Sequence, residues 1–184
     1  MTTPPVQMSV RLNADEMLGD RVLKVDHAGE HGAVCIYAGQ ILMARFTAPS
    51  LVPELREFIS HERRHRAVFG AELARRGRRR CRSYWFCGVG GFVLGVLTGL
   101  CGTGAIWATT AAVESVVLRH LIHQLDALRT ADPAAFAAIS SIVEDEQAHH
   151  DQSARRASGS FWLKVLTPVV AVSTEAVIWF GMHL

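Results

Sequence analysis

Long stretches of this chain carry apolar residues at every third or fourth position, and short segments rich in Pro, Gly or Ser separate them. This period is typical of amphipathic helices, and the sequence shows little of the alternation that marks β-strands. The breaks predict six helices, with boundaries good to about three residues. They cover about 21–46, 51–76, 85–98, 104–129, 133–157 and 161–182. We predict an all-α domain over residues 21–184, preceded by a flexible N-terminal extension over 1–20.

Two stretches are too apolar for ordinary surface helices. No Asp, Glu, Lys or Arg occurs from Ser83 to Val113, and Glu175 is the only carboxylate side chain between Val165 and Leu184. A run of this length can cross a membrane. The many glycines of the first stretch favour a segment that lies in the lipid interface or covers a buried core. The sequence therefore leaves open whether residues 83–113 and 161–184 lie on a membrane, span it or cover a buried core.

Charge narrows the range of partners. The formal net charge is only +2, so the composition does not indicate nucleic-acid binding. Six arginines nevertheless fall within residues 75–82. They form either a solvated helix end, favoured by the helix dipole, or a contact with anionic lipid head groups. Residues 1–20 lack the apolar core of a signal peptide, and the four cysteines form no C-x-x-C pair, so we expect reduced thiols in the cytosol.

Two copies of a Glu-x-x-His motif carry the candidate chemistry. Glu62 and His65 form one copy, and Glu146 and His149 form the other. Side chains at positions i and i+3 share a helix face and can reach one metal ion. A single pair of this kind is weak evidence, because Glu and His are common on helix surfaces.

The spacing of two further carboxylates strengthens the pattern. Glu30 lies 32 residues before Glu62, and Glu114 lies 32 residues before Glu146. The breaks at 47–50 and 131–133 fall halfway between the members of each pair. In an antiparallel hairpin, residues equidistant from the turn lie at the same height. The sequence therefore predicts a ferritin-like four-helix bundle of two repeated hairpins, plus two additional apolar helices.

Four carboxylates and two imidazoles at one level form the donor set of a dinuclear metal centre. Four ionised carboxylates balance two divalent ions, and the mixed oxygen and nitrogen donors suit iron, with manganese as the less favoured choice. We predict Glu62 and Glu146 as bridging ligands and Glu30 and Glu114 as terminal ligands. His65 and His149 are then assigned one to each ion. The predicted metal and catalytic residues are Glu30, Glu62, His65, Glu114, Glu146 and His149.

Several neighbours could support this centre. Asp145 is a candidate to orient a histidine ligand from the other hairpin, and His61 holds the equivalent place in the first hairpin. Asp26 and His27 lie one turn before Glu30 and are candidates for hydrogen bonds toward the site. Three further histidines are expected to be structural or exposed, namely His120, His123 and His150.

The same residues carry a family resemblance. Residues 25–40 read VDHAGEHGAVCIYAGQ, which resembles the first-helix signature of the Coq7 family of 5-demethoxyubiquinone hydroxylases. Both Glu-x-x-His motifs and the glycine-rich segment at 85–102 fit as well, so the resemblance covers about residues 21–184. His31 stands where the family often has Tyr, and Leu121 replaces an aromatic residue of some members.

The resemblance implies a di-iron monooxygenase that hydroxylates the ring of a demethoxyubiquinone-type lipid in ubiquinone biosynthesis. It implies O₂ as oxidant and NADH or a reductase as the source of electrons. It also implies peripheral attachment to the membrane surface, here the cytoplasmic side of the cell membrane. The assemblies compatible with it are a homo-oligomer and a quinone-biosynthesis complex. Two alternatives remain open: a ferritin-like iron-binding or storage protein without oxygenase activity, and a helical membrane protein with incidental Glu and His residues.

Overall fold

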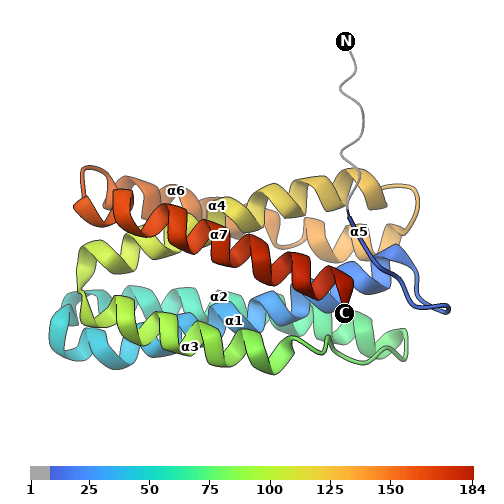
Figure 1. Cartoon of the computed structure of the whole chain (residues 1–184), viewed down its shortest axis with the longest axis horizontal. Helices are drawn as coiled ribbons and strands as arrows, with labels where there is room; N and C mark the ends of the chain where they lie inside the picture. The colour runs from blue at the N-terminus through green and yellow to red at the C-terminus, as the bar shows by residue number, and fades with distance from the viewer. Residues whose placement is uncertain (1–8) are drawn as a thin grey trace, which may run out of the picture.

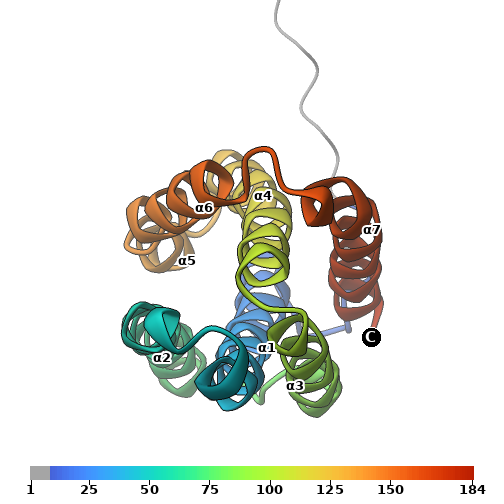
Figure 2. The same ribbon diagram turned by 90° about the vertical axis from the view of Figure 1, so that its left-hand side faces the viewer.

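The computed structural model describes residues 9–184, and this part of the chain is helical without strands (Figure 1). The helices α1, α2, α4 and α6, with the short α5, form two antiparallel hairpins, while α3 and α7 pack on the outside of α1 and α4 (Figure 2). The predicted all-α bundle is confirmed. The helices are α1 (Leu18–Thr47), α2 (Val52–Arg75), α3 (Tyr84–Leu100), α4 (Thr103–Leu128), α5 (Pro133–Ser140), α6 (Val143–Ala157) and α7 (Phe161–His183).

Two prolines lie at the turn of the first hairpin. A 3-10 turn, η1 (Pro49–Leu51), joins α1 to α2, and Pro53 occupies the first turn of α2. The first turn of a helix tolerates proline because its N–H groups have no partner within the helix. Gly77, just beyond the end of α2, has a φ of +64°, a conformation that favours glycine. The predicted limits at 51 and 76 agree closely with this helix.

The second hairpin differs from the prediction in one respect. The single helix expected over 133–157 is wrong, because the chain breaks between α5 and α6. The Ser141 hydroxyl donates to the backbone oxygen of Ala138 at 2.7 Å, and Ile142 has φ −113°. Serine side chains compete with the helix for backbone hydrogen bonds, which accounts for a break at the Ser140–Ser141 pair. Asp132 starts α5 by accepting a hydrogen bond from the Ala135 N–H.

The glycines of the apolar segment bring α3 against α1. A Cβ atom on Gly91 or Gly95 would overlap the carbonyl oxygens of Gly32 and Ile36 on α1. Glycine therefore permits a helix contact that any larger residue would push apart. The helix predicted over 85–98 is confirmed, because α3 is continuous from Tyr84 to Leu100.

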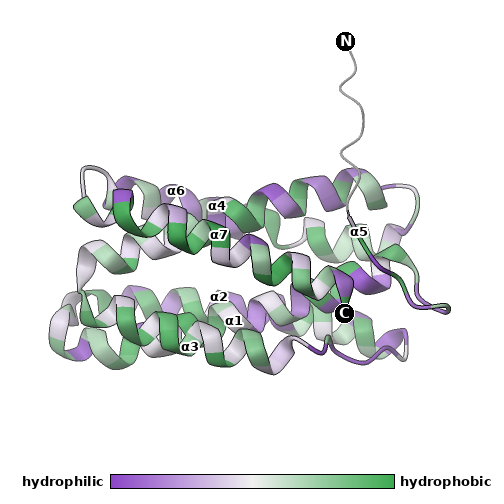
Figure 3. Cartoon of the chain, in the orientation of Figure 1, coloured by the Kyte–Doolittle hydropathy of each residue, from purple (hydrophilic) through white to green (hydrophobic). Residues whose placement is uncertain are grey.

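Helix α7 is the most exposed apolar element. Among residues 9–184, two helices are long and apolar enough to cross a membrane, namely α4, which is mostly buried, and α7, which is mostly exposed. Val172 and Phe161 on α7 are 70% and 69% exposed, and Trp85 at the start of α3 is 62% exposed. Figure 3 shows hydrophobic residues along the visible surfaces of both α3 and α7. We refer to the exposed side chains of α3 and α7 as the apolar face.

The predicted N-terminal extension lies partly outside the described residues, which begin at Ser9. Within residues 9–17, the Arg11 N–H donates to the Met182 carbonyl at 3.0 Å. Glu16 is 8% exposed and binds Arg21 at 2.6 Å and Lys24 at 2.7 Å. The Arg11 contact joins the segment before α1 to the end of α7, and the two ion pairs of Glu16 hold this segment against α1. The division of the chain at residue 20 stays a prediction.

The core consists of two main apolar clusters with a polar level between them. Leu23, Phe69, Leu128 and Ile139 belong to the cluster at the α5 end of the bundle. A second cluster at the η1 end contains Tyr37, Leu55, Phe58 and Trp107. Along α1, α2 and α4, the predicted metal residues fall between these clusters. The fold therefore surrounds one band of buried acids with apolar packing.

Candidate metal centre

The six predicted residues meet inside the bundle. Each is at most 6% exposed to solvent. Their potential ligand atoms form two groups, and within each group all atoms lie within 4.8 Å of one another. The first group is Glu30, Glu62, His65 and Glu146, and the second is Glu62, Glu114, Glu146 and His149. Glu62 and Glu146 belong to both groups, as two bridging residues would.

The closest contacts cross from one hairpin to the other. His65 Nδ1 lies 2.7 Å from Glu146 Oε1, and His149 Nδ1 lies 3.3 Å from Glu62 Oε1. Within the described residues, none of these four atoms has a partner in hydrogen-bond geometry. Donor atoms that converge without bonding to one another are the arrangement expected around a shared ion. These groups can hold a metal ion.

Burial and mutual repulsion set the protonation of the four acids. Burial, followed by the neighbouring carboxylates, raises the pKa of Glu30 and Glu114 well above the usual value. Burial also raises the pKa of Glu62 and Glu146 to about 8, and nearby carboxylates add to the effect. Four close carboxylates cannot all ionise in an apolar core without positive charge. Divalent cations would supply that charge, so the residues present fit a dinuclear centre.

Each histidine is held through its second ring nitrogen. His65 Nε2 lies 3.1 Å from Asp145 Oδ2, which also accepts a hydrogen bond from Arg64 at 3.1 Å. His149 Nε2 lies 3.0 Å from His61 Nδ1. In both cases Nδ1 faces the carboxylates. The structure thus places Asp145 on a histidine of the other hairpin, as the sequence suggested.

The two supporting contacts differ in chemistry. Burial alone would raise the pKa of Asp145, but the hydrogen bond and charge of His65 hold it below its ordinary value. Asp145 therefore presents a carboxylate to His65. His149 instead has an imidazole as its neighbour, and the Phe58 ring stacks on it at 4.3 Å. The two halves of the site are alike in geometry but unlike in charge.

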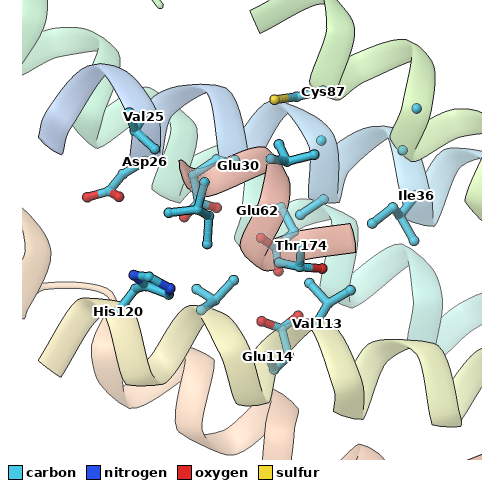
Figure 4. A pocket seen from close by; sticks show the side chains of 18 of the residues that line it. Val25, Asp26, Glu30, Ile36, Glu62, Cys87, Val113, Glu114, His120 and Thr174 are labelled. Carbon is cyan, nitrogen blue, oxygen red and sulfur yellow. The ribbon is translucent and has the colours of Figure 1, made fainter. Parts of the chain in front are cut away.

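A cavity of about 360 Å³ opens directly onto the acids. It lies between α1, α3, α4 and α7, and its wall includes Glu30, Glu62 and Glu114 (Figure 4). Glu146 lines it as well. Most of its other lining residues are apolar or glycine. Apolar pockets with a few polar groups are typical sites for small organic ligands. The buried centre is therefore accessible to an apolar molecule.

Sequence reasoning missed some polar residues of this cavity. His120, expected to be structural or exposed, lines it and lies 2.7 Å from Glu175 on α7. Gln124 also lines it and donates to Asp26. Of the two candidates before Glu30, only Asp26 lines the cavity. His27 stacks on Tyr84, with ring centres 5.1 Å apart. The position of Asp26 one turn before Glu30 was a usable signal, whereas Gln124 had none.

Comparison with known proteins decides the family. The family model described as "Ubiquinone biosynthesis protein COQ7" matches residues 17–181, nearly the whole chain. The chain belongs to this family. The predicted Coq7 resemblance is thereby confirmed, and the match includes all six residues of the candidate centre.

Relatives in the COQ7 family are named as hydroxylases. A "NADPH-dependent 3-demethoxyubiquinone 3-hydroxylase, mitochondrial" of Dictyostelium discoideum is 33% identical over 169 residues, which cover 90% of this chain and 77% of the relative. A "3-demethoxyubiquinol 3-hydroxylase" of Rhodospirillum rubrum is 34% identical over 165 residues, 87% of this chain and 76% of the relative. The "5-demethoxyubiquinone hydroxylase, mitochondrial" of Saccharomyces cerevisiae is 38% identical over 120 residues, 60% of this chain and 51% of the relative.

Proposed function

We propose that this protein is a di-iron monooxygenase that hydroxylates the ring of a demethoxyubiquinone-type lipid in ubiquinone biosynthesis. One observation carries the proposal: two overlapping groups of buried carboxylates and imidazoles line an apolar cavity. The hydroxylase names of the COQ7 relatives support the same reaction class.

The proposed ligand set follows the two groups. Glu30 and His65 would bind one iron, and Glu114 and His149 the other, with Glu62 and Glu146 shared between them. Carboxylate and imidazole donors suit iron and, less well, manganese. The Tyr37 hydroxyl lies 3.4 Å from Glu114 Oε1 and would orient that carboxylate. We propose these six residues as both the metal ligands and the catalytic residues.

The apolar cavity is the proposed quinone pocket. Its volume of about 360 Å³ lies within the range of small-ligand sites, so a substituted ring can enter while a long tail remains outside. Phe86 lines the cavity and is 61% exposed, so it joins the cavity to the apolar face. A lipid-dissolved quinone could reach the site from a membrane that contacts this face.

The protein would control the surroundings of the reaction. Bound diferrous iron would supply the electrons and the binding position for O₂ that oxygenation requires. Val113, Val117 and Leu121 on α4 line the cavity and limit access of water to the acids. Val25 and Ile36 on α1 do the same from the other side. The chain's own residues would thus bind the ring, orient it and keep the site dry.

Electrons would come from outside this chain. The name of the Dictyostelium relative specifies NADPH, and we propose NADH, NADPH or a reductase as the donor here. We also propose peripheral attachment to the cytoplasmic side of the cell membrane through the apolar face. Assembly with further copies of the chain or with other quinone-biosynthesis proteins belongs to the same proposal.

Metal analysis and turnover test the function together. The purified protein should bind about two irons per chain and consume O₂ only when a demethoxyquinone and a reductant are present. Expression in a strain blocked at ring hydroxylation should restore quinone synthesis, and Glu62→Ala should abolish the rescue. A protein that binds two irons but never hydroxylates the ring would instead be an iron-binding or storage protein.

A further inference from the structure

The apolar cavity has a polar pair at one end. Asp26 projects from α1 and Gln124 from α4, and both line the cavity. The Gln124 amide Nε2 donates to Asp26 Oδ1 at 2.9 Å, so the pair connects the two hairpins. Figure 4 shows Asp26 near Glu30 on one wall, with His120 on the wall opposite. Gln124 is only 2% exposed.

Each member of the pair keeps one unused polar atom. Asp26 Oδ2 and Gln124 Oε1 are shielded from solvent, and neither has a hydrogen-bond partner within residues 9–184. Buried polar atoms are almost always hydrogen-bonded, because desolvation without a partner is costly. Two such atoms on adjacent side chains at the wall of a ligand-sized cavity indicate a binding position for a polar group.

The other polar side chains of the cavity, apart from the proposed metal ligands, have partners already. His120 lies 2.7 Å from Glu175 Oε2. The hydroxyls of Ser173 and Thr174 both donate to the Val170 carbonyl of their own helix, at 2.9 and 2.8 Å. Among the described residues that line the cavity, the proposed metal ligands aside, only Asp26 and Gln124 have a buried polar atom without a hydrogen-bond partner.

We propose that Asp26 and Gln124 recognise a ring oxygen of the quinone or hydroquinone substrate. This inference rests on the proposed function and specifies how the ring is oriented. Asp26 lies one helical turn before Glu30, about 6 Å along the axis of α1. That length is comparable to a six-membered ring with its substituents. A ring oxygen held by the pair would therefore direct the ring carbons toward the acids.

The pair can bind either redox form of a ring. Burial raises the pKa of Asp26 to about 7, although the hydrogen bond from Gln124 opposes the shift. Near neutral pH its carboxyl group is therefore present in both forms. The protonated form can donate to a quinone carbonyl, while Gln124 Oε1 can accept a hydrogen bond from a hydroquinone hydroxyl.

A binding experiment separates ring recognition from a merely structural link. The metal-loaded protein is titrated without O₂ with a short-tailed methoxyhydroquinone and with the same molecule lacking its two ring hydroxyls. Wild type should prefer the hydroxylated ring by about tenfold or more. Gln124→Met should lower this preference by about 3–10-fold, the effect of one lost hydrogen bond. Asp26→Leu combined with Gln124→Met should abolish it, with little change in affinity for the deoxygenated ring.

Gln40 provides a matched control. It is also a buried glutamine, its Nε2 donates to Thr98 at 3.3 Å, and its Oε1 likewise lacks a hydrogen-bond partner within residues 9–184. It does not line the cavity. Gln40→Met should therefore keep the wild-type preference. If Asp26→Leu does not fold, Gln124→Met alone decides the question.

The outcomes distinguish this inference from the proposed function. A wild-type preference that persists in Gln124→Met and in the double variant would overturn the role of the pair and leave the hydroxylase proposal intact. A metal-loaded wild type that binds neither ring would overturn the quinone pocket itself. Equal binding of the two rings by wild type would mean that water satisfies the pair, and would also overturn the inference.

Discussion

His65 Nδ1 and Glu146 Oε1 lie 2.7 Å apart although the two residues belong to different hairpins. The reciprocal contact joins His149 and Glu62 at 3.3 Å. Each Glu-x-x-His motif therefore supplies a histidine to one side of the site and a carboxylate that meets the other motif. Neither hairpin can build the centre alone. Metal binding and the docking of the two hairpins should accordingly be coupled, since an ion bound at the centre stabilises only the folded arrangement.

The shared carboxylates should matter more than the terminal ones. Glu62→Ala removes a residue from both ligand groups, whereas Glu30→Ala removes one from the first group alone. We expect Glu62→Ala to lose both irons and at least 100-fold in hydroxylation rate, and Glu30→Ala to retain about one iron per chain. Metal content per chain by elemental analysis checks this. Glu57→Ala, an exposed position on α2, should keep both irons; equal loss in Glu30→Ala and Glu62→Ala would contradict the bridging assignment.

Asp145 should raise the metal affinity of the half of the centre that contains His65. Its carboxylate lies 3.1 Å from His65 Nε2 and fixes the ring so that Nδ1 faces the acids. Mutation of such supporting residues typically lowers metal affinity by about 10–100-fold. We expect Asp145→Asn to weaken one of two binding phases in a metal titration and to leave the other near its wild-type value. Asp126→Asn, whose side chain is 75% exposed, serves as the control. Uniform weakening of both phases would argue against the separate halves.

The sequence predicts the candidate site better than its surroundings. Glu30 and Glu114 lie at equal offsets from their motifs. Because residues equidistant from the turn of an antiparallel hairpin lie at the same height, these offsets suffice to bring the six residues to one level. The contact of His120 with Glu175 depends instead on how α7 packs on α4. No local pattern encodes that packing, so His120 could not be identified as a cavity residue in advance, whereas Asp26 could be from its position one turn before Glu30.

Glycine and serine also limited the prediction of the fold. The pattern predicts a helix over 85–98 but does not show that Gly91 and Gly95 bring it against α1, because that contact depends on a neighbouring helix. Ser140 and Ser141 lie within an otherwise helical pattern, yet the chain breaks there. In both cases the outcome is set by competing hydrogen bonds or by tertiary contact rather than by hydrophobic period.

Gly95→Ala should destabilise the bundle. Its added Cβ would overlap the Ile36 carbonyl, which is backbone and cannot move aside easily. Overpacking of this kind costs about 1–3 kcal/mol. Urea unfolding followed by circular dichroism measures the effect. Gly90→Ala on the same helix is the control, because nothing lies within 4 Å of its added Cβ and alanine favours helices. Similar stability changes in the two variants would argue against the close contact of α3 with α1.

Without metal, the protein should become less stable as the pH rises from 6.5 to 8. The pKa values of Glu62 and Glu146 are raised to about 8 in the folded state. Such acids stabilise the fold while protonated, and this contribution is lost as the pH rises from the unfolded value near 4.5 through about 8. Half-buried His27 has the opposite effect on stability, because its pKa is lowered to about 4, but that effect is confined below its unfolded value near 6.5.

Thermal unfolding of chelator-treated protein measures how the stability of the metal-free protein changes with pH. The melting temperature should fall between pH 6.5 and 8, and saturating iron should remove or reverse the fall, because bound cations favour ionised carboxylates. Glu62→Gln combined with Glu146→Gln should reduce the pH dependence of the metal-free protein, and Asp26, whose pKa is raised to about 7, should account for part of the remainder. A metal-free wild type whose melting temperature rises over this interval would contradict the assigned protonation.

Attachment to lipid should depend on the apolar face of α3 and α7. Val172 on α7 is 70% exposed, and a charge there would have to be dehydrated when the helix enters the lipid interface. We expect Val172→Glu to reduce co-sedimentation with anionic phospholipid vesicles by about tenfold and to leave the circular dichroism spectrum unchanged. Ala127→Glu, at an exposed position on α4 outside this face, should bind vesicles nearly as well as wild type. Equal losses in both variants would assign the effect to net charge, and no loss in either would place the membrane contact elsewhere on the molecule.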